Sequence, residues 1–306
     1  PDLRGSQGTF SFFSTASKDG KAAFTGGEQT VLRRKGNVIR SRIVGPDNSL
    51  VKGGNRLILP ITITIADDEK SALIEIEGCD PFRLEPETYS DWIQLTFKAG
   101  LGVKVRGIAR FYITSLAPEF NLYMTPIHID PENPAMMPIS HPTVYSIYLA
   151  KKLGPFATLG LAEDTWALNE RVIDEKAFFE QAMLFCEERE RMFKDALAKV
   201  KKGLVTTVFD TTDRVQHMFY RYLDPTHPAN EGKDTEVCKD AIAQVYERMD
   251  SLLGEVFELT DDPDTIFMVI SDHGFTNFRR CVNLNSWLQE NGYLHLKDGA
   301  ETSGDW

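Results

Sequence analysis

Two stretches decide the fold of the second half of the chain: LVTTVFDTTDRVQH at residues 204–217 and IFMVISDHG at residues 266–274. Each begins with an unbroken apolar run rich in β-branched residues, Leu204–Phe209 and Ile266–Ile270. Such runs are typical of strands covered on both faces in a parallel sheet. Residues 235–259, between them, repeat apolar side chains at helical spacing. The order strand, helix, strand predicts a right-handed βαβ crossover and therefore an α/β fold.

The polar residues that follow the two predicted strands are candidate metal ligands. Asp213 and His217 are four residues apart, so they share one face of a helical turn. Asp272 and His273 follow the second run, and Gly274 permits a sharp turn there. Because ligands bind beyond the carboxyl ends of parallel strands, we expect the two Asp/His pairs to face each other across one cleft. The alternative is two Asp residues that cap or turn the chain beside packed histidines.

Other charged residues near these motifs are open to two interpretations. Asp210 is expected to cap the helix that follows it, in preference to orienting His217. Arg279 and Arg280 are candidates for holding a phosphate through a bidentate guanidinium, and they are equally compatible with surface ion pairs. The same two interpretations apply to Arg214.

The first 130 residues have a different texture, since short β-branched and aromatic stretches alternate with Gly, Asn and Asp turns. We predict a β-rich domain over residues 1–130 and an α/β metal-site domain over residues 131–306, joined by a proline-rich crossing. The expected strands are Thr9–Phe13, Val38–Val44, Ile58–Ile65, Ala72–Ile76, Trp92–Phe97, Val103–Thr114 and Leu122–Ile129. A second amphipathic helix is expected over Glu175–Val200.

The composition is that of an ordinary globular protein: of 306 residues, 42% are hydrophobic, 26% charged and 10% aromatic. These fractions exclude collagen-like, disordered and disulfide-scaffold proteins. The first 130 residues carry 16 Lys and Arg against 15 Asp and Glu, and the others carry 18 against 30. Because the acidic half lacks the basic footprint that phosphates require, we expect no nucleic-acid duplex as partner. We expect no membrane partner, since no apolar run reaches the roughly 20 residues of a membrane span.

Cysteine usage predicts the compartment. Four widely spaced residues form no C-x-x-C pair: Cys79, Cys186, Cys238 and Cys281. They are expected to be free thiols in a reducing compartment, which favours a cytoplasmic location.

The two motifs resemble those of a known family. An Asp-x-x-x-His motif followed by an Asp-His pair at the end of a core strand is similar to the alkaline phosphatase superfamily, specifically its type I phosphodiesterase/nucleotide pyrophosphatase branch. Five stretches resemble its subgroup of predicted phosphohydrolases and phosphomutases: PDLRG at 1–5, IDPENP at 129–134, DRVQHMF at 213–219, SDHGF at 271–275 and VNLNSWL at 282–288. The resemblance covers nearly the whole chain. It implies part of an alkaline phosphatase-like sheet with covering helices, and makes the β-rich region an inserted domain.

The resemblance also implies a ligand set and a reaction. Asp213 and His217 would bind one divalent ion, and Asp272 and His273 would bind a second. In such sites two cations clamp the attacking and leaving oxygens at phosphorus while a Thr or Ser forms a phospho-enzyme. Mixed Asp and His ligation favours zinc and also permits manganese or iron.

The chain departs from the superfamily in two places. The family places a further Asp ligand and the nucleophile near its N-terminus, and a further His ligand near its C-terminus, and neither has a counterpart here. His227, in a proline-containing turn, and His295, in a strand-like run, are poor substitutes. We therefore expect an internal fragment of a longer phosphohydrolase, inactive by itself, which contains no catalytic nucleophile and need not retain its metals.

The expected activity is hydrolysis of phosphate esters or diesters of a small-molecule or nucleotide-like substrate. Two alternatives stay open: a phosphomutase of the phosphoglycerate type, which shares the metals, and a non-catalytic domain that keeps the four residues as structural polar groups. Convergence of the four side chains within a few ångströms would favour the enzymes.

Overall fold

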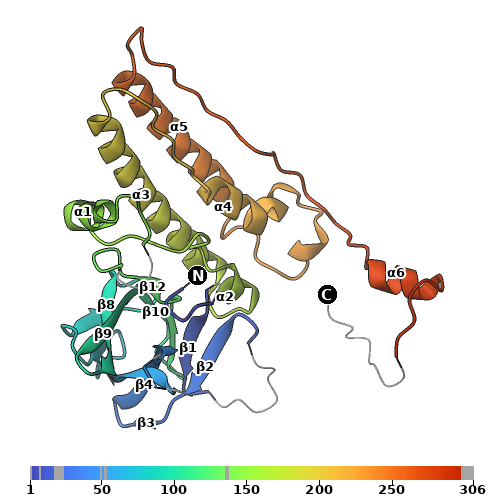
Figure 1. Cartoon of the computed structure of the whole chain (residues 1–306). Coiled ribbons are helices and arrows are strands. Elements are labelled where there is room, and N and C mark those ends of the chain that lie inside the picture. Colours follow the sequence, from blue (N-terminus) through green and yellow to red (C-terminus); the bar gives the residue numbers. More distant parts are fainter. Residues whose placement is uncertain are drawn as a thin grey trace.

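The computed structural model describes residues 2–6, 8–16, 24–48, 50–51, 54–134 and 138–297. All its strands lie before residue 130 and all its helices after residue 143 within that part of the chain. The predicted ends of the two domains, at residues 1 and 306, fall outside the described residues. Figure 1 shows the strands gathered at one end and the two longest helices extending away from them.

The strands form three sheets. Their orders are β10-β11-β1-β2, β12-β9-β8 and β3-β4-β5-β6-β7, where the strands are β1 (Phe10–Ser14), β2 (Gly27–Val31), β3 (Arg34–Lys35), β4 (Val38–Asp47), β5 (Arg56–Ile65), β6 (Ala72–Ile76), β7 (Phe82–Leu84), β8 (Ile93–Gly100), β9 (Val103–Ala109), β10 (Phe111–Ser115), β11 (Asn121–Met124) and β12 (His128–Ile129). Neighbouring strands are antiparallel except β1 and β2, which are parallel.

The strand predictions for this region are confirmed. In β5 the isoleucines at 61, 63 and 65 are buried while the threonines between them are partly exposed, which is the pattern that alternation predicts. Two predicted strands are each divided: 103–114 is interrupted at Arg110, and 122–129 is interrupted around Pro126. Strands β2, β3 and β7 were not predicted, because β2 is mostly polar and β3 and β7 are only 2 and 3 residues long.

One sheet is shared between two hydrophobic cores. Phe13, Phe111 and Leu122 belong to the core that fills the β-rich region. Phe10 and Tyr123, from the same strands, belong to a second core that contains the helices. Because successive side chains of a strand point to opposite faces, the sheet β10-β11-β1-β2 lies between the two cores and joins the two parts of the molecule.

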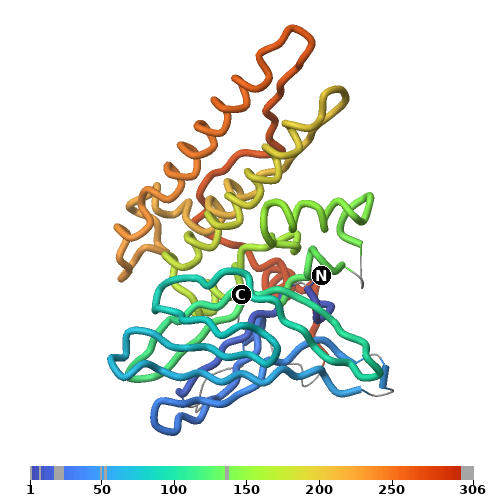
Figure 2. The backbone as a smooth tube through the Cα atoms, turned by 90° about the vertical axis from the view of Figure 1, so that its left-hand side faces the viewer, coloured from blue at the N-terminus to red at the C-terminus, as the bar shows by residue number. Residues whose placement is uncertain are grey.

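The helices pack around the second core. They are α1 (Val144–Leu153), α2 (Thr165–Asn169), α3 (Glu175–Lys199), α4 (Thr211–Phe219), α5 (Ala241–Leu259) and α6 (Leu284–Glu290), with short 3-10 turns η1 (Tyr220–Leu223) and η2 (Pro228–Asn230). The long helices α3 and α5 run side by side (Figures 1 and 2). The predicted helix 175–200 is confirmed, and the helix expected over 235–259 begins later, at Ala241.

The prediction of a βαβ unit is wrong for this structure. Leu204–Phe209 and Ile266–Ile270 are extended but belong to no strand. Leu204 is 84% exposed and Ile270 is 88% exposed, although the Phe209 ring lies 5.8 Å from that of Phe193 in α3 and the Phe267 ring lies 5.0 Å from that of Phe257 in α5. The physical reason is pairing: a β-branched run becomes a strand only when a neighbouring strand satisfies its backbone groups, and no strand of the described chain lies beside either run.

No helix within the described ranges has both the length and the apolar composition needed to cross a bilayer.

Candidate metal centre

The sequence of α4 directs Asp213 and His217 away from the core. Thr211, Val215 and Phe219 are buried at intervals of four residues, and the Phe219 ring lies 5.8 Å from that of Phe178 in α3. Asp213 and His217 lie two positions after the first two of these residues, which places them on the opposite face of the helix. Packing of the apolar face therefore fixes the orientation of the polar one.

The segment that carries Asp272 and His273 returns along α5 and α4 after the turn at the end of α5 (Figure 1). Its contacts with α4 and η1 hold it in place. The Tyr220 hydroxyl donates to the carbonyl oxygen of Phe275 at 3.0 Å. The Phe275 ring lies 4.9 Å from the ring of His217 and 5.2 Å from that of His273. Phe275 thus forms an apolar contact shared by both histidines.

These contacts bring the two motifs together at Asp213. Its Oδ1 atom lies 3.2 Å from Nε2 of His217 and 3.5 Å from Nε2 of His273. The two imidazole rings are 6.4 Å apart. Three of the four predicted ligands, from segments more than fifty residues apart in sequence, therefore converge on one carboxylate oxygen.

A backbone hydrogen bond orients the ring of His273. Its Nδ1 atom lies 3.0 Å from the carbonyl oxygen of Gly274. A carbonyl only accepts, so Nδ1 carries the proton, and Nε2 of the neutral ring is an acceptor that faces Asp213. Two acceptors at this distance require a proton or a metal cation to join them. Histidine ligands of metals are oriented by this kind of Nδ1 hydrogen bond.

The Asp213 carboxylate and the imidazoles of His217 and His273 are chemically suited to bind a divalent cation, since carboxylate oxygen and imidazole nitrogen are both ligands of zinc and manganese. Asp272 is less well placed. Its Oδ2 atom is 3.8 Å from Nε2 of His273, and its side chain is 90% exposed. Among the described residues, no group of three or more His, Cys, Asp or Glu is arranged to hold a metal ion. The motifs are therefore brought together without forming a closed coordination site.

Asp210 does not have the expected role. It stands at the N-cap position of α4, but its side chain makes no capping hydrogen bond. Its carboxylate instead lies 2.6 Å from Nη1 of Arg189 in α3. The same Nη1 lies 3.1 Å from buried Glu163, whose pKa is raised by burial, and 3.3 Å from the Thr211 hydroxyl. Arg189 therefore connects the start of α4 to α3, and an ion pair replaces the predicted cap.

The arginines that follow His273 differ in their contacts. Arg279 pairs with Asp224 through both Nε, at 3.2 Å, and Nη2, and Nη2 also donates to the Thr226 hydroxyl at 2.5 Å. Hydrogen bonds from Arg279 and from the Thr226 hydroxyl lower the pKa of Asp224 to about 2. Arg280 makes no ion pair with any residue that the structure describes. Arg214, for its part, pairs with Asp213 at 2.9 Å.

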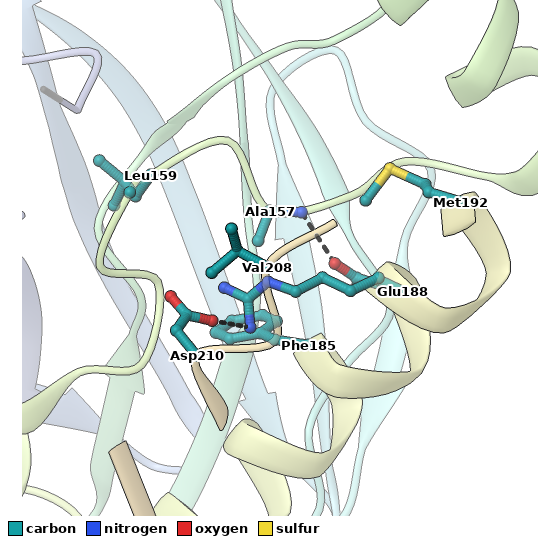
Figure 3. A pocket seen from close by; sticks show the side chains of 9 residues that line it. Ala157, Leu159, Phe185, Glu188, Met192, Val208 and Asp210 are labelled. Carbon is teal, nitrogen blue, oxygen red and sulfur yellow. Dashed lines mark hydrogen bonds and ion pairs between the residues drawn. The ribbon is translucent and has the colours of Figure 1, made fainter. Parts of the chain in front are cut away.

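Two cavities lie near this region, and none of the four predicted ligands lines either. One, of about 320 Å³, lies between α3 and the start of α4, where Glu188, Met192, Val208 and Asp210 line it (Figure 3). The other, of about 910 Å³, lies where the sheet β10-β11-β1-β2 meets α2 and η1. The converging motifs are instead at the surface, where the side chain of His217 is 55% exposed.

Sequence reasoning did not identify three residues of this region. Asp224 belongs to no sequence motif, although it binds Arg279. Tyr220 and Phe275 carry no motif of their own, and only their distance in space from the histidines gives them a role. His227 forms no hydrogen bond with the four predicted metal ligands. Its Nε2 atom lies 3.0 Å from the carbonyl oxygen of Phe278.

Comparison with known proteins places these motifs in a family. The model of the family described as "Type I phosphodiesterase / nucleotide pyrophosphatase" matches residues 135–304, which include all four predicted ligands. No curated protein and no solved structure gives a match. The matched region covers more than half of the chain. The chain belongs to the type I phosphodiesterase/nucleotide pyrophosphatase family.

Proposed function

We propose that this chain carries part of the active site of a two-metal phosphohydrolase that cleaves phosphate esters or diesters. Family membership supports hydrolysis of phosphoesters of small molecules or nucleotides. The observation that carries the proposal is the convergence of His217 and His273 on Oδ1 of Asp213, at 3.2 and 3.5 Å.

In the proposed site, Asp213 and His217 would hold one ion, and Asp272 and His273 would hold the other. Bound divalent ions would supply stabilisation of the charge on the phosphoryl, attacking and leaving oxygens. The residues of the chain orient the ligands: the Gly274 carbonyl keeps the proton of His273 on Nδ1, and α4 presents Asp213 and His217 from a face fixed by its buried side. The nucleophile of the proposed phospho-enzyme would come from outside residues 1–306.

Metal titration of the chain tests the ligand assignment. In calorimetry with ZnCl₂ or MnCl₂ we expect weak binding, because four ligands for two ions leave each ion with too few protein donors. Asp213→Asn should abolish this binding, since it replaces the carboxylate on which both histidines converge with a neutral amide, which is a weaker metal ligand. His295→Ala, a change at an exposed histidine away from the motifs, is the matched control and should bind as the wild type does. Retention of binding in Asp213→Asn would refute the assignment.

Activity is tested with a form of this protein that contains the proposed nucleophile. Assays with bis-p-nitrophenyl phosphate, p-nitrophenyl phosphate and phosphoglycerate separate the diesterase, the monoesterase and the phosphomutase alternative. We expect Asp272→Ala to abolish the activity that is found, and full activity in this variant would exclude Asp272 as a ligand. Absence of activity towards all three would favour a non-catalytic domain.

A further inference from the structure

The approach of His273 to Asp213 depends on a segment without secondary structure of its own. Residues 266–283 form neither helix nor strand. His273 also lies on the exposed side of this segment, with half of its side chain accessible. An extended chain with so few backbone hydrogen bonds has no intrinsic reason to keep one imidazole within 3.5 Å of a carboxylate on α4. Its position must therefore come from contacts that neighbouring residues of the segment make with the rest of the molecule.

The strongest of these contacts surround Asp224, which follows η1. Oδ2 of Asp224 accepts from Nδ2 of Asn277 at 2.6 Å and from the guanidinium of Arg279. Arg279 donates in turn to the hydroxyl of Thr226. Two residues of the extended segment, only two positions apart, thus share one carboxylate oxygen. Charge-assisted hydrogen bonds of this type are roughly twice as strong as neutral ones.

A second set of contacts joins backbone carbonyls of the same segment to side chains of η1 and of the turn that follows it. His227 Nε2 lies 3.0 Å from the Phe278 carbonyl oxygen, and the Tyr220 hydroxyl donates to the Phe275 carbonyl. η1 follows directly after α4 and carries Tyr220, so it is continuous with the helix that presents Asp213. A segment fixed to this loop is consequently fixed relative to Asp213.

We infer that Asp224 and Arg279 form a positioning clasp that fastens residues 275–279 to the loop after α4 and thereby holds His273 beside Asp213. This inference rests on the proposed metal centre and assigns Arg279 a positioning role in place of the predicted contact with substrate. The guanidinium of Arg279 is occupied by Asp224 and Thr226, whereas Arg280 is exposed and forms no ion pair within the described part of the chain.

The test uses three variants of the full chain: Asp224→Asn, Arg279→Gln and the double variant. The first readout is the initial rate at which chymotrypsin cleaves the chain after Phe275. The cleavage is carried out without metal and is measured by mass spectrometry. Loss of a charge-assisted hydrogen bond should raise this rate roughly tenfold. The second readout is calorimetric affinity for Zn²⁺, which should fall by a similar factor. If the two residues act as one unit, the double variant should be no worse than either single variant.

Lys98→Gln is the matched control, because it removes an exposed ion pair with Glu77 in the β-rich region and should change neither readout. Arg279→Lys, which keeps the charge, should recover part of both.

An unchanged cleavage rate in Asp224→Asn would overturn the clasp. Faster cleavage with unchanged Zn²⁺ affinity would overturn its positioning role. If the wild type binds no Zn²⁺ at all, the proposed metal centre fails, while the cleavage rate still decides whether the clasp holds the segment.

Discussion

Stability in acid should depend on one buried histidine, His128 in β12. Its side chain is fully buried, and its ring lies 4.8 Å from the ring of Trp92 and 6.2 Å from that of Phe185. Nδ1 accepts a hydrogen bond from the backbone N–H of Thr158 at 2.9 Å, so the neutral ring has its proton on Nε2. Burial, with a smaller contribution from Arg110, lowers the pKa of His128 from 6.5 to about 3, although Asp2 opposes the change.

The sign of the effect follows from this lowered pKa. The unfolded chain takes up a proton near pH 6.5, whereas the folded chain keeps His128 neutral until about pH 3. The contribution of His128 to stability is therefore complete above pH 6.5 and is lost progressively as the pH falls towards 3. One proton corresponds to about 1.4 kcal/mol per pH unit, so the loss between about pH 6.5 and about pH 4.5 is about 2–3 kcal/mol.

The assay is urea unfolding, followed by tryptophan fluorescence and circular dichroism, at steps from neutral pH to about pH 4.5. His128→Asn keeps an acceptor for Thr158 and removes the titrating ring. We expect this variant to start less stable because of the cavity and to decline by about 2–3 kcal/mol less than the wild type over the same range. His295→Asn, at an exposed position, should follow the wild type. Parallel declines for the wild type and His128→Asn would refute the reasoning.

Three further changes test the packing by the same unfolding assay. Gly107→Ala should lower the free energy of unfolding by about 1–3 kcal/mol, because its Cβ would lie 2.8 Å from a main-chain oxygen of β12. Gly160→Ala has open space around it and should leave the free energy of unfolding unchanged. Equal effects of the two substitutions would contradict this prediction. Glu188→Gln should lower the free energy of unfolding by about 3–5 kcal/mol, because it leaves buried Arg110 without its charge partner. Adding Arg110→Met should recover part of this loss. A double variant less stable than Glu188→Gln alone would contradict the prediction. Phe219→Ala should cost about 3–5 kcal/mol through the cavity between α3 and α4, and a loss below about 1 kcal/mol would show that this contact is not tightly packed.

The β-rich region could be predicted from local pattern alone. Strands such as β5 and β6 alternate in sequence, and alternation is sufficient because each of them has one buried and one more exposed face. The D-x-x-x-H motif was likewise expected on a helical turn, and α4 confirms it. These features depend on residues a few positions apart.

The features that the sequence did not predict depend on residues far apart. The runs 204–209 and 266–270 have strand composition, but pairing requires a neighbouring strand, and none in the described chain provides it. Asp210 has the composition of a cap, yet Arg189, about twenty residues earlier, attracts its carboxylate. Asp224 and Arg279 are separated by 55 residues, and no periodicity connects them. Local pattern therefore predicted the helical placement of Asp213 and His217 but not the distant residues that contact the predicted motifs and the segments around them.

The two largely exposed runs, 204–209 and 266–270, also affect how the chain behaves in concentrated solution. Uncharged stretches of Val, Ile, Phe and Thr that pair with no strand of the described chain are the kind of segment from which intermolecular cross-β stacking begins. Charges stand at both ends of each run: Lys201, Lys202 and Asp210 flank the first, and Asp261, Asp262, Asp264 and Asp272 flank the second. Such gatekeeper residues oppose stacking by electrostatic repulsion. High salt would weaken this repulsion at both runs, and acid would weaken it at the second run, whose flanking charges are all Asp, so low ionic strength and neutral pH are the conditions under which the chain should stay monodisperse.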